Sequence, residues 1–224
     1  MKTFCTNVWS RYRHQFSDPG FILSIIWSFA FLAVSICLDH YASIYALERA
    51  SNPVTDIILS NIRAYDVDFV FIYGPVVFWG IITAFLLAHP QRIPFTLKSI
   101  ALFVVFRTFF VSLTHIAPFP EQAVIDYHSF FTSIFTSGSD LFFSGHTGGP
   151  FLMALVFWKY RTMRIFCLLA SVFFGCIVLL GHYHYTIDVV SAFFITYAIY
   201  HIAEYLFKKD YTRFSQLLAP SRES

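Results

Sequence analysis

Six apolar stretches, each roughly 20 residues long, constrain this chain more than any other feature of its sequence. A helix that crosses the hydrocarbon core of a bilayer needs about 20 mostly apolar residues. We therefore expect an all-α membrane protein in which the stretches form six transmembrane helices. The expected helices are Phe21–Leu38, Phe69–Leu87, Ile93–Ile116, Phe143–Trp158, Met163–Leu180 and Asp188–Phe207.

Composition supports this class of protein and excludes others. Hydrophobic residues make up 57% of the chain and charged residues 12%, whereas soluble domains have roughly 25% charged residues. A net charge of +2 is too small to indicate a nucleic-acid partner. We expect one six-helix domain over residues 21–207, preceded by a segment over residues 1–20 and followed by a tail over residues 208–224.

The distribution of lysine and arginine predicts the orientation of the helices. The expected loops Ala117–Phe142 and Gly181–Ile187 contain neither residue type, and only Arg49 and Arg63 lie in the loop Asp39–Asp68. Cytoplasmic loops are enriched in these residues, so both chain termini are expected in the cytoplasm. The basic residues on that side are Lys2, Arg11, Arg13, Arg92, Lys159, Arg161, Arg164, Lys208, Lys209, Arg213 and Arg222.

The N-terminal segment and the cysteines say less about structure and function than the apolar stretches do. Residues Met1–Phe16 mix aromatic and basic side chains, which fits either an amphipathic helix on the cytoplasmic membrane surface or a solvated tail. The cysteines form no CxxC pair and no zinc-like spacing with histidine, so neither a disulfide framework, a metal nor a cofactor is expected. The four cysteines are Cys5, Cys37, Cys167 and Cys176.

Histidines gather on the side of the membrane that faces away from the cytoplasm. One group lies at the expected start of the fourth helix, where the free N–H groups of a helix N-terminus favour phosphate. There Ser144 and Thr147 offer hydroxyls, Gly145 permits close backbone approach, and His146 is placed as a general acid. The six histidines of this side are His40, His115, His128, His146, His182 and His184.

A second motif lies at the expected start of the sixth helix. His184 and Asp188 are four residues apart, so they share one helix face if the helix begins by His184. A carboxylate bonded to one imidazole nitrogen fixes the tautomer and makes the other nitrogen more nucleophilic. Each motif alone is also typical of an ordinary helix start. Together, at the same membrane depth, they predict two histidines and an acid that converge on one phosphate.

These motifs resemble those of a known family. Ser144-Gly145-His146-Thr147 and His184-Tyr185-Thr186-Ile187-Asp188-Val189 are similar to the two signature motifs of sphingomyelin synthases, which belong to the PAP2-like lipid phosphatase/phosphotransferase superfamily. Asp140 matches an acid that precedes the first motif, although Gly138-Ser139 replaces the usual Cys-Gly.

Weaker similarities lie at Pro53–Asp56, which resembles a P-x-x-D stretch of the family, and at Arg107–Pro120, which resembles its arginine-bearing third helix. A K-x6-R-P phosphate motif, found in many lipid phosphatases of the superfamily, is absent from the sequence. This absence favours the sphingomyelin-synthase-like branch.

The resemblance implies a PAP2-like helical bundle and a mechanism. His184 would attack the phosphorus of a phospholipid head group, Asp188 would orient it, and His146 would protonate the departing diacylglycerol oxygen. A phosphohistidine would then transfer phosphocholine or phosphoethanolamine to a lipid alcohol such as ceramide or diacylglycerol. With water as acceptor, the same site would be a lipid phosphatase or phospholipase C. The expected substrate-binding residues are Arg107, Asp140, Ser144, Gly145, Thr147 and Tyr185.

Arg107 is the one arginine deep inside an expected helix. Its fork of N–H donors matches phosphate oxygens, which favours contact with the substrate. An ion pair with Asp140, Asp126 or Glu121, or extension of the side chain to the interface, explains its position equally well.

Other functions stay open at this point. Several histidines at helix ends are also typical of a membrane haem or electron-transfer protein, which a Soret band would reveal. A transporter is disfavoured because the sequence shows no inverted repeat. The compact form favours a bacterial inner membrane, with the site facing the periplasm, over a Golgi or plasma membrane. The expected partners are a phospholipid donor, a lipid alcohol acceptor and the membrane, and a homo-oligomer is compatible with the sequence.

Overall fold

The computed structural model describes residues 2–121 and 141–216, and in these residues the secondary structure is helical with no strand. Two 3-10 turns, η1 (Leu59–Asn61) and η2 (Pro90–Arg92), accompany the α-helices. The α-helices are α1 (Lys2–Phe16), α2 (Pro19–Arg49), α3 (Asp68–Leu87), α4 (Ile93–Leu113), α6 (Gly145–Val156), α7 (Arg161–Leu180), α8 (Thr186–Leu206) and α9 (Lys208–Gln216).

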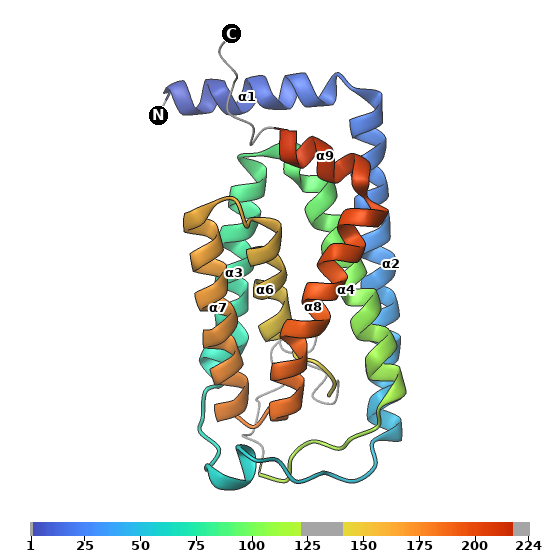
Figure 1. Cartoon of the computed structure of the whole chain (residues 1–224), viewed down its shortest axis with the longest axis vertical. Coiled ribbons are helices and arrows are strands. Elements are labelled where there is room, and N and C mark those ends of the chain that lie inside the picture. The colour runs from blue at the N-terminus through green and yellow to red at the C-terminus, as the bar shows by residue number, and fades with distance from the viewer. Residues whose placement is uncertain (1, 122–140, 217–224) are drawn as a thin grey trace.

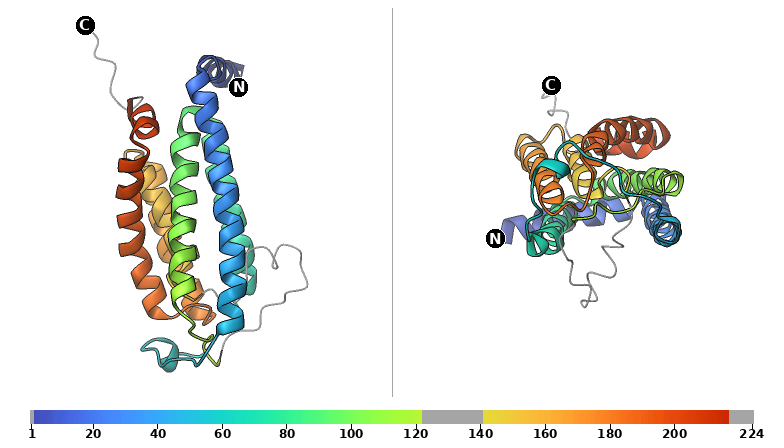
Figure 2. Two further views of the ribbon diagram at one scale, coloured as in Figure 1. Left: turned by 90° about the vertical axis from the view of Figure 1, so that its right-hand side faces the viewer. Right: turned by 90° about the horizontal axis from the view of Figure 1, so that it is seen from below.

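The helices form a bundle with two different ends (Figure 1). Helices α2, α3, α4, α6, α7 and α8 run along a common axis and alternate in direction, as the side view in Figure 2 also shows. Helix α1 crosses one end, which also holds α9 and is called the terminal end below. The opposite end, called the distal end, contains residues 50–67, 114–121 and 181–185.

Five helices of the described residues are long and apolar enough to cross a membrane, and they indicate a multi-pass membrane protein. They are α2, α3, α4 with its preceding turn, α7 and α8. The fourth expected span forms α6, which has 12 residues. Its length of about 18 Å is less than the roughly 30 Å of the hydrocarbon core, so the expectation of six spanning helices is not confirmed.

Helix α6 is short because its start is fixed by local structure. Phe143 has a positive φ of 28°, which stops the helix from extending towards the N-terminus. The Ser144 side chain then accepts a hydrogen bond from the Thr147 amide at 3.4 Å, as an N-cap does. Residues Gly148–Pro150 and Leu152–Val156 are buried against α4, α7 and α8, so α6 is an interior helix.

Helix α2 is longer than the sequence predicted. It begins at Pro19, where Asp18 accepts a hydrogen bond from the Gly20 amide, and it ends at Arg49 instead of Leu38. Its last turns bury the small residues Ala42, Ser43 and Ala46, and its most extensive packing is against α4. The expected end was wrong because this packing extends the helix past the polar residues that follow Leu38.

The remaining expected spans agree with α3, α4, α7 and α8 to within three residues at each end. Helix α1 forms in the segment expected to be either a surface helix or a tail. Helix α9 was not predicted, and a buried ion pair holds it against the bundle. Lys98 of α4 lies 2.6 Å from Asp210 of α9, whose carboxylate also accepts a hydrogen bond from Ser24 of α2.

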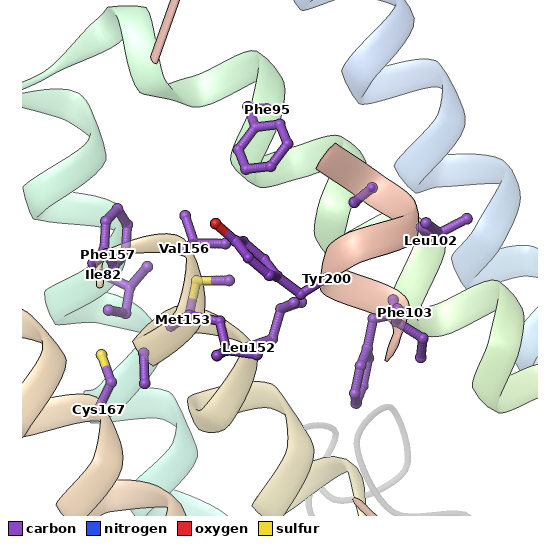
Figure 3. Close-up of a cluster of buried hydrophobic side chains, with 14 of the residues drawn as sticks. Ile82, Phe95, Leu102, Phe103, Leu152, Met153, Val156, Phe157, Cys167 and Tyr200 are labelled. Atoms are coloured by element: carbon purple, nitrogen blue, oxygen red, sulfur yellow. The ribbon is translucent and has the colours of Figure 1, made fainter. Parts of the chain in front are cut away.

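The main hydrophobic core occupies the part of the bundle nearer the terminal end. Figure 3 shows Phe95 and Phe103 of α4, Leu152 and Met153 of α6, and Tyr200 of α8 in this cluster. Because α6 supplies many of its buried residues, the core fixes the helix whose N-terminus carries the first histidine motif.

The close packing of α6 leads to a first prediction. A Cβ atom on Gly148 would lie 2.8 Å from both the Phe103 ring and the Thr196 hydroxyl oxygen. We expect Gly148→Ala to destabilise the protein by about 1–3 kcal/mol through overpacking. Thermal unfolding in detergent would measure the change. Gly80→Ala is the control, because nothing lies within 4 Å of its Cβ position and alanine favours the helix by about 1 kcal/mol. Equal stability of the two variants would contradict the packing described here.

Candidate active site

The second histidine motif forms a buried pair at the distal end. Helix α8 begins at Thr186, so Asp188 lies in its first turn and His184 lies just before it. Nδ1 of His184 is 3.2 Å from Oδ2 of Asp188, and the same oxygen accepts a hydrogen bond from the Tyr185 amide at 3.1 Å. The pair therefore forms although the helix does not begin by His184, because Asp188 reaches back over the helix start.

Both side chains of this contact are buried. His184 is 5% exposed and Asp188 is 1% exposed. A hydrogen bond from Nδ1 to a carboxylate fixes the neutral imidazole with its proton on Nδ1. In that tautomer the lone pair resides on Nε2, a nitrogen that is chemically able to act as a nucleophile.

A backbone hydrogen bond joins the two histidine motifs. The Ser144 amide donates to the Asp188 carbonyl at 3.0 Å, so the start of α6 lies against the first turn of α8. The two motifs lie more than 30 residues apart in the sequence. In the structure the two motifs lie together at the distal end of the bundle.

An aromatic ring forms a second connection between the motifs. The Phe71 ring stacks on the His146 imidazole at a centroid distance of 4.3 Å and an interplanar angle of 18°. It also contacts the Tyr183 ring at 4.2 Å, and the Tyr183 hydroxyl donates a hydrogen bond to Asp68. Phe71 therefore contacts both His146 and Tyr183, the residue that precedes His184. Nothing in the sequence predicted this contact, since Phe71 is one of many phenylalanines in apolar helices.

Arg107 lies beside the start of α6. The position of a Cβ atom on Gly145 would be 3.4 Å from Nε of Arg107, and this arginine is 8% exposed. Its Nη1 atom is 3.2 Å from Oδ1 of Asp39, which also accepts a hydrogen bond from Thr108. Asp39 was expected in a loop and was not considered as a partner. Among the expected partners, Asp140 and Asp126 lie outside the described residues.

The other expected site residues have contacts within the protein. Ser144 is buried and caps α6, while the Thr147 side chain packs 3.4 Å from the Cβ position of Gly175. The Tyr185 hydroxyl donates to the Ala117 carbonyl at 2.9 Å and accepts from the Val54 amide at 3.3 Å. Their contact with a substrate stays a prediction, as does that of Asp140.

The remaining distal histidines do not join this pair through any contact of the described residues. His40 and His115 make edge contacts with Tyr41 and Tyr45. His182 is buried, has a positive φ of 57° and lies edge-on to the Phe119 ring. His128 lies outside the described residues. The site thus centres on His146, His184 and Asp188 rather than on all six histidines.

The fold and the site describe a multi-pass membrane protein with a buried histidine–aspartate pair beside a second histidine. Residues 138–205, which contain both histidine motifs, match the family model described as PAP2 superfamily C-terminal. This match supports membership of the PAP2-like superfamily, whose enzymes are lipid phosphatases and phosphotransferases, and so supports phosphorus-group chemistry. No curated protein and no solved structure matches the chain.

Proposed function

We propose that this protein is a sphingomyelin-synthase-like lipid phosphotransferase. It moves a phosphocholine or phosphoethanolamine group from a glycerophospholipid to a lipid alcohol such as ceramide or diacylglycerol. One observation carries the proposal: the buried 3.2 Å contact between His184 and Asp188, which adjoins the motif that holds His146. A nucleophile, an orienting group and a general acid are the three roles that this transfer needs.

In the first half of the reaction, Nε2 of His184 attacks the phosphorus atom of the donor. The bond between phosphorus and the diacylglycerol oxygen breaks, and the protonated His146 gives its proton to that oxygen. Asp188 stabilises the positive charge that develops on the His184 ring. The products are diacylglycerol and a head group bound to His184 through a P–N bond.

In the second half, the now neutral His146 accepts the proton of the lipid alcohol. The alcohol oxygen attacks the same phosphorus atom, the P–N bond breaks, and its electron pair returns to His184. Both centres are then in their starting protonation states. The ping-pong sequence lets one site serve two lipids in turn.

The phosphate oxygens need positive groups in both transition states. The N-terminus of α6 offers the positive end of its helix dipole, and Arg107 lies against Gly145 at that point. We therefore assign Arg107 and Gly145 to the phosphate. The other residues that we propose to contact the substrate are Asp140, Ser144, Thr147 and Tyr185.

We propose that the terminal end faces the cytoplasm and that the site faces the opposite side of the membrane. The basic residues of α1, η2, the start of α7 and α9 lie in segments at the terminal end, which agrees with the positive-inside rule. Helix α1, with Trp9 and Phe16 exposed, lies across this end as a surface helix would. A bacterial inner membrane, with the site in the periplasm, remains the favoured location.

Lipid analysis tests the proposed function. Purified protein is incubated with mixed phospholipids, ceramide and diacylglycerol, and the lipids are analysed by mass spectrometry. We expect the head group on ceramide, or on added diacylglycerol whose acyl chains differ from those of the donor, together with the diacylglycerol that the donor releases. Free phosphocholine, phosphoethanolamine or phosphate without a new lipid would instead show that water is the acceptor. A Soret band in the purified protein, with no lipid turnover, would overturn both enzyme assignments.

A further inference from the structure

Asp56, in the distal loop over residues 50–67, is bonded far more completely than a loop carboxylate needs to be. Its Oδ1 accepts hydrogen bonds from the Ile58 and Leu59 amides at 2.9 and 3.0 Å, and from the Thr186 hydroxyl at 2.6 Å. Its Oδ2 accepts a hydrogen bond from the Thr186 amide at 2.7 Å. Both carboxylate oxygens thus accept hydrogen bonds. Two of the four donors lie in the loop, and the other two belong to Thr186 on another element.

The second element is the start of the helix that carries Asp188. Thr186 is the first residue of α8 and lies 130 residues from Asp56 in the sequence. The amides of a first helical turn have no partner inside the helix, and the helix dipole favours a negative charge there. Asp56 therefore satisfies an N-terminal amide of α8 from outside the helix, through short charge-assisted bonds.

The same loop holds the turn around the nucleophile at two further points. The Val54 amide donates to the Tyr185 hydroxyl at 3.3 Å, and the Tyr65 amide donates to the Leu180 carbonyl at 2.8 Å. Leu180 ends α7, and Tyr185 follows His184 directly. The loop thus contacts the chain on both sides of His184, and Asp56 makes the only charged contact among these three.

We propose that Asp56 is a positioning residue of the active site, which orients His184 by fixing the first turn of α8. The inference rests on the proposed function and deepens it. Asp188 holds His184 with the oxygen that also binds the Tyr185 amide, so the geometry depends on where residues 185 and 186 lie. Asp56 fixes residue 186 and makes no contact with His184 itself.

The charge of Asp56 is constant over the working range of pH. Burial raises its pKa, but the hydrogen bonds from Thr186, Leu59 and Ile58 outweigh burial and hold the pKa below its ordinary value of 3.8. A carboxyl whose folded pKa is lowered stabilises the fold above its unfolded pKa, and this support is lost only as pH falls through the lowered value. Replacing Asp56 should therefore lower the rate without shifting the midpoints of a pH profile near neutrality.

The experiment compares Asp56→Asn with Asp18→Asn in the full-length protein in lipid nanodiscs. Asp18 is the matched control, because it caps α2 through the Gly20 amide at the terminal end. Loss of a charge-assisted bond at one helix start corresponds to about a 10- to 100-fold effect. For Asp56→Asn we expect amide hydrogen exchange at residues 185–188 to accelerate, and kcat to fall, by amounts in this range. KM should stay within about twofold, because Asp56 does not touch the substrate.

Two further measurements separate positioning from a purely structural role. Thr186→Ser keeps both bonds to Asp56, so kcat should stay within about twofold of the wild-type value. Asp18→Asn should change neither exchange at residues 185–188 nor kcat. If exchange in Asp56→Asn accelerates while kcat stays unchanged, the positioning role is wrong. It is also wrong if exchange at residues 185–188 does not change. If wild-type protein turns over none of the lipids, the proposed function fails, whereas the exchange data still decide whether Asp56 holds the start of α8.

Discussion

Replacing His184 with asparagine is expected to reduce lipid turnover by at least about 10³-fold while the protein still folds. Asparagine keeps an N–H donor near the place of Nδ1, so Asp188 retains a partner, but it has no nitrogen that can attack phosphorus. Asp188 is 1% exposed, and a variant without such a donor, such as His184→Ala, would leave a buried carboxylate short of one bond. Turnover per folded molecule is measured with a labelled phospholipid, and folding by thermal unfolding.

The same variant tests the covalent intermediate. Wild-type protein given a donor labelled in its head group, without an acceptor, should carry the label in a bond that acid cleaves and base does not, as expected of phosphohistidine. His184→Asn should carry none. His201→Ala is the control, because His201 lies on the same helix, is exposed and pairs with Glu204 away from the site. Full turnover by His184→Asn would exclude His184 as the nucleophile.

Replacing His146 should have the second largest effect, and its size should depend on the leaving group. A general acid contributes roughly 10²- to 10⁴-fold to the rate, so His146→Gln should slow phospholipid turnover by about this factor. A planar amide in place of imidazole keeps contact with the Phe71 ring, which limits any change in packing. A nitrophenyl ester of phosphocholine releases an oxygen that needs no proton, so the first step, which forms the intermediate from this ester, should be far less affected.

The second half of the reaction gives this variant a distinct time course. In the proposed mechanism His146 is also the base that activates the incoming alcohol, so the intermediate should form from the nitrophenyl ester and then persist. We expect a burst of about one nitrophenolate per enzyme, followed by a slow steady rate, in His146→Gln. If the rate of the nitrophenolate burst falls as much as the rate of phospholipid turnover, His146 does not act as the acid.

The parts of the fold that the sequence predicted are those with a strong local signal. Apolar stretches bounded by polar residues located α3, α4, α7 and α8 closely. Helix α2 was predicted too short, since its last turns contain Asp39, His40 and Glu48 and are stabilised by packing on α4. Helix α6 agrees with its expected stretch to within two residues at each end, and Phe143 and Ser144 fix its start, but its 12 residues are too few to span the hydrocarbon core.

In the candidate site too, local contacts were predicted and contacts between distant residues were not. His184 and Asp188 were predicted to meet because their spacing is short, and the contact depends on only five consecutive residues. The partner of Arg107 was not predicted, because Asp39 is 68 residues away and two long helices must pack before the pair exists. The contacts of Phe71 and Asp56 likewise join residues that lie far apart in the sequence. Asp56 had a weak signal in the Pro53–Asp56 stretch, whereas Phe71 had none.

The placement of α1 and α9 at one end of the bundle and both histidine motifs at the other has a consequence for the bilayer itself. With head-group transfer at the distal end, donor lipid is consumed and product lipid appears in a single leaflet. A product with a charged head group stays there, because moving charge through the hydrocarbon core is costly. The released diacylglycerol carries no charge and can cross. The enzyme would therefore change the composition of one leaflet while supplying a neutral lipid to both, and so create transbilayer asymmetry without a pump.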